Sequence, residues 1–155
     1  PEAEMIICPI GGGGGISGIV LAAKQINPDI RIIGVEAEQA ASMFESIRSG
    51  KIVELSSANT FADGIAVRKP GSITFEIVKK YVDDIVTVSE QEMKSTICTL
   101  AKEARIIAEG AGASPVAALL SGKISAENIS NVVCVITGGN INISLFKSFL
   151  DNETK

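Results

Sequence analysis

The sequence of 155 residues contains no histidine, and aromatic residues make up only 4% of it. Without histidine the chain cannot hold the Ser-His or Cys-His pairs that many nucleophilic enzymes use. Acid–base chemistry would then depend on lysine, carboxylates, hydroxyl groups or a cofactor. The mild net charge of -4 and the few aromatic residues argue against a nucleic-acid partner.

Cysteine is also scarce, and Cys8, Cys98 and Cys134 lie far apart in apolar runs. Three separated cysteines predict buried, reduced thiols in a cytoplasmic protein. No apolar run approaches the roughly 20 residues of a membrane span, and no signal-peptide pattern opens the sequence, so we expect no membrane partner. Because the first residue is Pro1 rather than methionine, we interpret the chain as a piece of a longer protein.

A run of five glycines, Gly11–Gly15, is the most informative motif in the chain. It follows the apolar segment 5–10 and precedes an amphipathic segment that starts at Ile16, an order that predicts strand, turn and helix. Unobstructed backbone N–H groups at the positive end of a helix bind phosphate or carboxylate groups. A flexible linker is the alternative, but linkers do not normally join a buried strand to a helix.

The glycine run fits more than one kind of phosphate site. No Gly-Lys-Ser/Thr follows it, which excludes the Walker pattern. The dinucleotide fingerprint matches at Gly13, Gly15 and Gly18, and Glu36 stands where a ribose-binding acid would lie. That spacing favours a nicotinamide-dependent Rossmann domain. A terminal phosphate held by backbone N–H groups fits equally well, either in an enzyme or in a non-catalytic domain that binds a phosphorylated metabolite.

Hydrophobic periodicity predicts one α/β domain over residues 1–155, with an open, largely parallel sheet and helices on both faces. The last strand is Val-rich and apolar throughout, so we expect it to be central. Residues 150–155 should form a frayed tail. The expected strands are residues 4–10, 31–36, 84–88 and 131–136. The expected helices are residues 16–26, 39–48, 72–81, 89–107, 114–120 and 141–150, and a short helical turn is expected at 125–130.

Three polar residues outside the glycine run are candidate ligand contacts. Glu109 lies among small residues at a helix start, where it could contact a ligand or cap backbone N–H groups. Thr137 ends a buried strand, so its hydroxyl could face a cleft or cap the following turn. Glu36 could bind a ribose or a metal, or be a solvated strand end. The irregular segment 51–71 is long enough to suggest a functional loop.

Five motifs occur in order over nearly the whole chain. They are Pro9–Gly14, Thr60–Gly64, Val82–Ser89, Glu109–Ala113 and Thr137–Ile141. Together they resemble the carboxyl-terminal half of the fold-type II pyridoxal-phosphate enzymes, most closely the threonine dehydratases and serine racemases.

The resemblance implies pyridoxal 5′-phosphate as cofactor and β-elimination of L-threonine to 2-oxobutanoate and ammonia. It also implies a small amino-acid substrate, threonine or serine, and a homo-oligomer. Thr137 would place its hydroxyl against the pyridine nitrogen, where the family usually has serine. Gly64 would approach the ring, and Glu109 would lie near the cofactor. The residues implied to hold the 5′-phosphate are Gly12, Gly13, Gly14 and Gly15.

Two departures from the family pattern matter. The lysine that carries the cofactor and the loop that binds the substrate carboxylate belong to the amino-terminal half of the family, which this sequence lacks. We therefore expect the chain to be inactive alone. Glu36 and Ala40 match two positions of a cation site found in some members, but Ser42 replaces an aspartate. The sequence thus leaves a metal site open.

Overall fold

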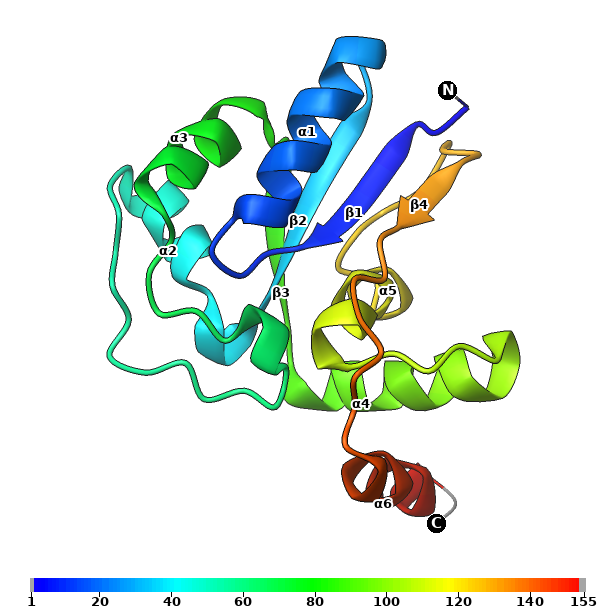
Figure 1. Ribbon diagram of the computed structural model, residues 1–155. Helices are drawn as coiled ribbons and strands as arrows, with labels where there is room; N and C mark the ends of the chain where they lie inside the picture. Colours follow the sequence, from blue (N-terminus) through cyan, green and yellow to red (C-terminus); the bar gives the residue numbers. More distant parts are fainter. Residues whose placement is uncertain (1, 154–155) are drawn as a thin grey trace.

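A four-stranded parallel sheet forms the centre of the computed structural model, which describes residues 2–153 (Figure 1). The strand order is β3-β2-β1-β4, and β1 pairs with both β2 and β4. All pairings are parallel, so the carboxyl ends of the strands lie at one edge of the sheet. The strands are β1 (Met5–Pro9), β2 (Arg31–Ala37), β3 (Asp84–Val88) and β4 (Val132–Cys134).

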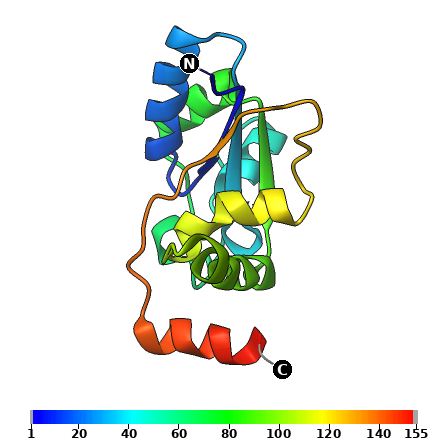
Figure 2. The same cartoon turned by 90° about the vertical axis from the view of Figure 1, so that its right-hand side faces the viewer.

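Helices cover both faces of the sheet, as predicted (Figures 1 and 2). On one face, Cys8 and Ile32 of the strands share a buried cluster with side chains of α1, α2 and α3. On the other face, Ile7 and Val35 pack with side chains of α4 and α5. Burial on both sides explains why β1 and β2 are nearly continuous apolar runs. The helices are α1 (Gly14–Ile26), α2 (Ser42–Ser49), α3 (Ser72–Tyr81), α4 (Glu90–Thr99), α5 (Gly110–Leu120) and α6 (Ile143–Glu153).

The start of α4 agrees with the sequence, but its end does not. Ser89 and Glu92 form the predicted capping box, in which each side chain accepts the backbone N–H of the other residue. We predicted a helix to Ile107, yet α4 gives way to a single π-helical turn over Leu100–Ala104, and Arg105 adopts φ 59°. This reversal returns the chain to the sheet edge, where the N–H of Glu109 bonds to the carbonyl of Gly138.

Helix α5 begins at Gly110, not at Ser114 as the Ser-Pro pair predicted. Pro115 therefore lies inside the helix, where its missing N–H would leave the carbonyl of Ala111 without a donor. The hydroxyl of Ser114 donates to that carbonyl at 2.9 Å and replaces the lost bond. The side chain before the proline thus allows the helix to continue through it.

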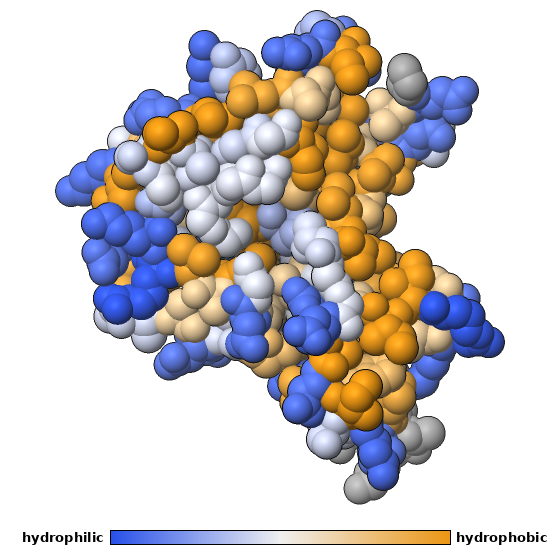
Figure 3. Space-filling view, in the orientation of Figure 1, coloured by the Kyte–Doolittle hydropathy of each residue, from blue (hydrophilic) through white to orange (hydrophobic). Residues whose placement is uncertain are grey.

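The strand β4 lies at the sheet edge, so our prediction of a central strand was wrong for this chain. An apolar strand sequence indicates that both faces of the strand are covered, but it does not determine whether the strand pairs with another strand on each side. Val133 of β4 is 42% exposed. Figure 3 shows apolar surface gathered on the side of the molecule where β4 lies.

Other boundaries also differ from the predicted ones. Helix α2 begins at Ser42 rather than at residue 39, because a 3₁₀ turn occupies Glu38–Ala40. The short turn expected within residues 125–130 is present: the N–H of Ile129 bonds to the carbonyl of Ala126 at 3.1 Å, and Asn128 takes φ 63°.

Helix α6 lies beyond α4, on the side away from the sheet (Figure 2). It continues to Glu153, although we expected the chain to fray from residue 150. Phe149 is only 7% exposed and packs with Ile97 and Cys98 of α4, which anchors the last turns. Residues 154 and 155 of the expected tail lie outside the described residues. None of the helices within residues 2–153 is long and apolar enough to cross a membrane.

Candidate functional site

The glycine run forms a turn whose backbone N–H groups lack partners in the helix that follows. Helix α1 begins at Gly14, two residues before the predicted start, and Gly13 is its N-cap with φ 91°. The N–H groups of Gly14, Gly15 and Ile16 lie in the first turn, where a helix supplies no acceptors. No side chain caps them and no acidic residue stands in that turn. The turn therefore favours an anion at the positive end of α1.

A cavity of about 210 Å³ opens over this turn. It forms where the loops after β1 and β4 meet, since these parallel strands are neighbours and end at the same sheet edge. Thr137, which follows β4, thereby reaches the glycine run. The lining residues are Pro9, Gly11, Gly12, Gly13, Gly14, Gly15, Gly64, Ile65 and Thr137. Six of the seven residues that the sequence singled out as cofactor contacts share this cavity.

The space around each glycine of the run shows whether the fold itself requires a residue without a side chain at that position. A Cβ atom on Gly13 would lie 2.7 Å from Cε of Met43 and 2.8 Å from Cβ of Thr74, so the packing of the chain requires glycine there. A Cβ atom on Gly12, Gly14 or Gly15 would meet no atom within 4 Å. The chain's own packing gives no reason for glycine at these three positions. A ligand seated in the cavity would.

The seventh residue, Glu109, lies in an adjoining cavity of about 150 Å³. Gly64 lines both cavities and connects them. A Cβ atom on Gly64 would lie 3.1 Å from Oε1 of Glu109, and one on Gly138 only 2.6 Å from the same oxygen. The carboxylate thus fills the space between two glycine backbones. Its Oε2 accepts the N–H of Asn140 at 3.1 Å, so Glu109 stabilises the turn after Thr137.

Gly64 is held at the cavity by a residue that sequence analysis missed. Glu90, the first residue of α4, accepts the hydroxyl of Thr60 at 2.6 Å and the N–H of Phe61 at 3.3 Å. These bonds anchor the otherwise irregular segment that leads to the 3₁₀ turn Asp63–Ile65. Glu90 lies 30 residues from Thr60, and no local sequence pattern could connect the two.

Glu36 does not reach the site, which corrects its proposed role as a ribose contact. Its side chain is 0% exposed, and its two oxygens accept the N–H groups of Met43 at 2.9 Å and Phe44 at 2.7 Å. The carboxylate therefore caps α2 from within the core. Burial raises the pKa of Glu36 to about 7, against the lowering effect of these two bonds. Glu36 is therefore not available to bind a ribose, as the hypothesis of a dinucleotide site requires.

The contacts of Glu36 also concern the cation site that the family resemblance suggested at Glu36, Ala40 and residue 42. Both oxygens of Glu36 are engaged by α2, and the buried hydroxyl of Ser42 has no hydrogen-bond partner. Within residues 2–153 no group of three or more His, Cys, Asp or Glu side chains could hold a metal ion.

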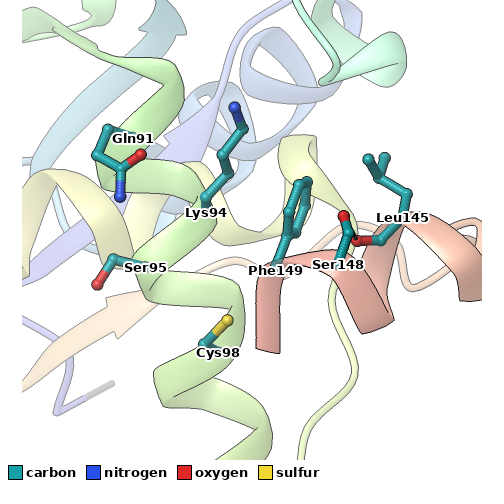
Figure 4. Close-up of a pocket in the computed structure, with 7 residues that line it drawn as sticks. All are labelled: Gln91, Lys94, Ser95, Cys98, Leu145, Ser148 and Phe149. Atoms are coloured by element: carbon teal, nitrogen blue, oxygen red, sulfur yellow. Dashed lines mark hydrogen bonds between the residues drawn. The ribbon is translucent and has the colours of Figure 1, made fainter. Parts of the chain in front are cut away.

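A larger cavity of about 370 Å³ lies between α4 and α6 and is a separate feature. Figure 4 shows Gln91, Lys94 and Cys98 of α4 on one side and Leu145 and Phe149 of α6 on the other. The ammonium group of Lys94 lies 5.6 Å from the ring centre of Phe61 and 5.7 Å from that of Phe149. These cation–π contacts give Lys94 a packing role. The cavity contains none of the predicted site residues.

Comparison with known proteins gives a matching family and several named relatives. The family described as "Pyridoxal-phosphate dependent enzyme" matches residues 1–138. The chain is 47% identical over 145 residues to the catabolic L-threonine dehydratase TdcB of Escherichia coli, covering 92% of this chain and 44% of that protein. It is 44% identical over 151 residues to the L-threonine ammonia-lyase of Thermotoga maritima, covering 97% of this chain and 37% of that protein.

Solved structures give the same result for the fold. Maize serine racemase superposes with a TM-score of 0.89 at 36% identity, covering 99% of this chain and 48% of that one. The processed threonine deaminase isoform 2 of Solanum lycopersicum superposes with a TM-score of 0.87 at 34% identity, covering 97% of this chain and 44% of that one. The chain thus spans less than half the length of each of these four proteins.

Proposed function

Because this chain belongs to the family of pyridoxal-phosphate dependent enzymes, we propose that it supplies the cofactor-binding part of a threonine dehydratase. The whole protein would convert L-threonine to 2-oxobutanoate and ammonia by β-elimination. The relatives that are 44–47% identical and carry threonine ammonia-lyase or dehydratase names support this activity. The single observation that carries the proposal is the glycine cavity, with free backbone donors and room above Gly12, Gly14 and Gly15.

The residues of the cavity fit the parts of pyridoxal phosphate. The N–H groups of the glycine turn would bind its 5′-phosphate, because they are the donors that α1 leaves free. Thr137 would offer a neutral hydroxyl to the pyridine nitrogen, and Gly64 would let the ring approach the backbone. A hydroxyl partner, unlike a carboxylate, does not favour a positive charge on that nitrogen. When bound, the cofactor supplies an electron-withdrawing ring that stabilises negative charge at the substrate α-carbon.

Proton transfer must be supplied by another part of the protein. None of the lysines among the described residues lines either the glycine cavity or the cavity beside Glu109. Residues 2–153 therefore offer no lysine amine to carry the cofactor or to remove the α-proton there. The glycine cavity of about 210 Å³ is also smaller than the roughly 300–1,000 Å³ of typical small-molecule sites. Both observations fit a partial site that a longer chain completes.

The test compares the full-length protein with the 155-residue chain. With pyridoxal phosphate and L-threonine, the full-length protein should form 2-oxobutanoate, whereas the isolated chain should form none. L-serine in place of threonine reports the substrate preference, and NAD in place of pyridoxal phosphate tests the rival cofactor. Activity of the isolated chain would refute the claim of a partial site. Tight NAD binding without pyridoxal phosphate binding would overturn the proposed function.

The compartment and the assembly of the whole protein belong to the same proposal. Cys8, Cys98 and Cys134 are in the reduced thiol form in the structure, which fits the reducing cytoplasm. We further propose that the full-length protein is a homo-oligomer. Sedimentation equilibrium of the full-length protein tests this, and a concentration-independent monomer mass would contradict it.

A further inference from the structure

The glycine turn is held from behind by a helix that lies 62 residues further along the chain. The hydroxyl of Thr74, in the first turn of α3, lies 2.6 Å from the carbonyl oxygen of Gly12. The N–H of Gly71, the N-cap of α3, bonds to the same oxygen at 3.3 Å. The hydroxyl also lies 3.0 Å from the carbonyl of Gly71, but it has one proton, and the shorter contact to Gly12 is the better bond.

This contact determines the direction of the next N–H group. No cis peptide bond occurs among the described residues, and in a planar trans peptide the C=O and N–H groups point in opposite directions. With the carbonyl of Gly12 bound to α3, the N–H of Gly13 must therefore point away from α3. The glycine cavity contains no residue of α3 in its lining, so it opens on that opposite side.

The packing behind Gly13 reinforces the same orientation. Its Cα faces Thr74 and Met43, and a Cβ atom there would lie within 2.8 Å of both side chains. The turn thus packs against α2 and α3 and cannot move toward these helices. A glycine run is otherwise the most flexible kind of backbone, and ordering it only upon binding would cost affinity.

We propose that Thr74 is a positioning residue for the bound phosphate group, although it does not line the cavity itself. Its hydroxyl holds the Gly12–Gly13 peptide so that the N–H of Gly13 joins those of Gly14 and Gly15 before the ligand arrives. This inference rests on the proposed function, because it takes the ligand to be pyridoxal phosphate. Loss of the hydroxyl should raise the Kd for that ligand roughly tenfold, the effect of one neutral hydrogen bond.

The experiment measures equilibrium binding to the full-length protein of two ligands, pyridoxal phosphate and pyridoxal, which lacks the phosphate. Thr74→Val keeps the shape of the side chain and removes the hydroxyl, and Thr74→Ser restores it. Thr99→Val is the matched control, because the hydroxyl of Thr99 also bonds to a carbonyl, that of Ser95, but within α4. We expect Thr74→Val alone to lose affinity for pyridoxal phosphate, while pyridoxal binds equally to all four proteins.

The outcomes separate this inference from the function on which it rests. If Thr74→Val binds pyridoxal phosphate as tightly as the wild type, or if its affinity for pyridoxal falls equally, the positioning role is refuted. If the wild type itself binds pyridoxal phosphate no more tightly than pyridoxal, the proposed function fails and this inference fails with it. Should Thr74→Val not fold, Thr74→Ala removes the same hydroxyl with less bulk and is judged by the same criterion.

Discussion

Replacing single glycines with alanine separates the glycine that the fold needs from the glycine that the ligand needs. In Gly13→Ala the new methyl group would sit at φ 91°, which costs about 1–2 kcal/mol for an L-residue. It would also overlap Cβ of Thr74 at 2.8 Å, which overpacks the site by about 1–3 kcal/mol. The free energy of unfolding should therefore fall by about 2–5 kcal/mol.

Gly15→Ala and Gly18→Ala should behave in the opposite way. Both positions lie in α1, and a Cβ atom at either meets no atom within 4 Å. Alanine should leave the helix unchanged or stabilise it by up to about 1 kcal/mol. Only Gly15 lines the cavity, so only Gly15→Ala should weaken pyridoxal phosphate binding, by roughly tenfold or more if the methyl group displaces the phosphate.

Two assays measure the stability of these variants and their affinity for pyridoxal phosphate. Urea unfolding of the 155-residue chain measures stability, and titration of the full-length protein with pyridoxal phosphate measures the ligand effect. The reasoning is refuted if Gly13→Ala is as stable as the wild type, because its positive φ and close contacts would then cost nothing. It is equally refuted if Gly15→Ala and Gly18→Ala bind the cofactor with the same affinity.

Three further changes test the packing around the site. The pKa of Glu36 is raised by burial from 4.5 to about 7, so its contribution to stability, about 3 kcal/mol, is complete below about pH 4.5 and disappears as the pH rises through 7. Melting curves across this range should show that decline in the wild type and not in Glu36→Gln. Ser114→Ala should lower the free energy of unfolding in urea by about 1–3 kcal/mol, because it leaves the buried carbonyl of Ala111 without a hydrogen-bond donor. Ser121→Ala, which removes a longer bond in a half-buried position, should change it very little. Lys123→Met removes bonds to Glu38, Glu92 and the carbonyl of Thr87 and should cost about 1 kcal/mol, less in 1 M salt if its ion pairs contribute.

Local patterns predicted the elements whose causes lie within a few residues. The helix over Ser72–Tyr81 and the strand over Asp84–Val88 have the predicted bounds, and the capping box at Ser89 is present. The order strand, glycine turn, helix was also confirmed. These features depend on hydrophobic period and on capping chemistry, which the sequence displays directly.

The features that sequence reasoning missed depend on contacts between distant segments. The sequence suggested Glu36 as a ligand contact, because nothing in it shows that the carboxylate caps α2. The cap forms only when the fold brings the N–H groups of Met43 and Phe44 to the Glu36 side chain. The bond from Thr74 to Gly12 joins residues that share no motif. The start of α5 was misplaced because proline usually marks a first turn, and the compensating Ser114 hydroxyl is visible only in three dimensions.

A crystal structure of the full-length protein with pyridoxal phosphate tests the central claim most directly. Our account places the phosphate oxygens about 2.9 Å from the backbone nitrogens of Gly14 and Gly15, at ordinary hydrogen-bond distance. It also places the hydroxyl of Thr137 within hydrogen-bond reach of the pyridine nitrogen. A phosphate bound elsewhere, such as in the cavity between α4 and α6, would contradict the account.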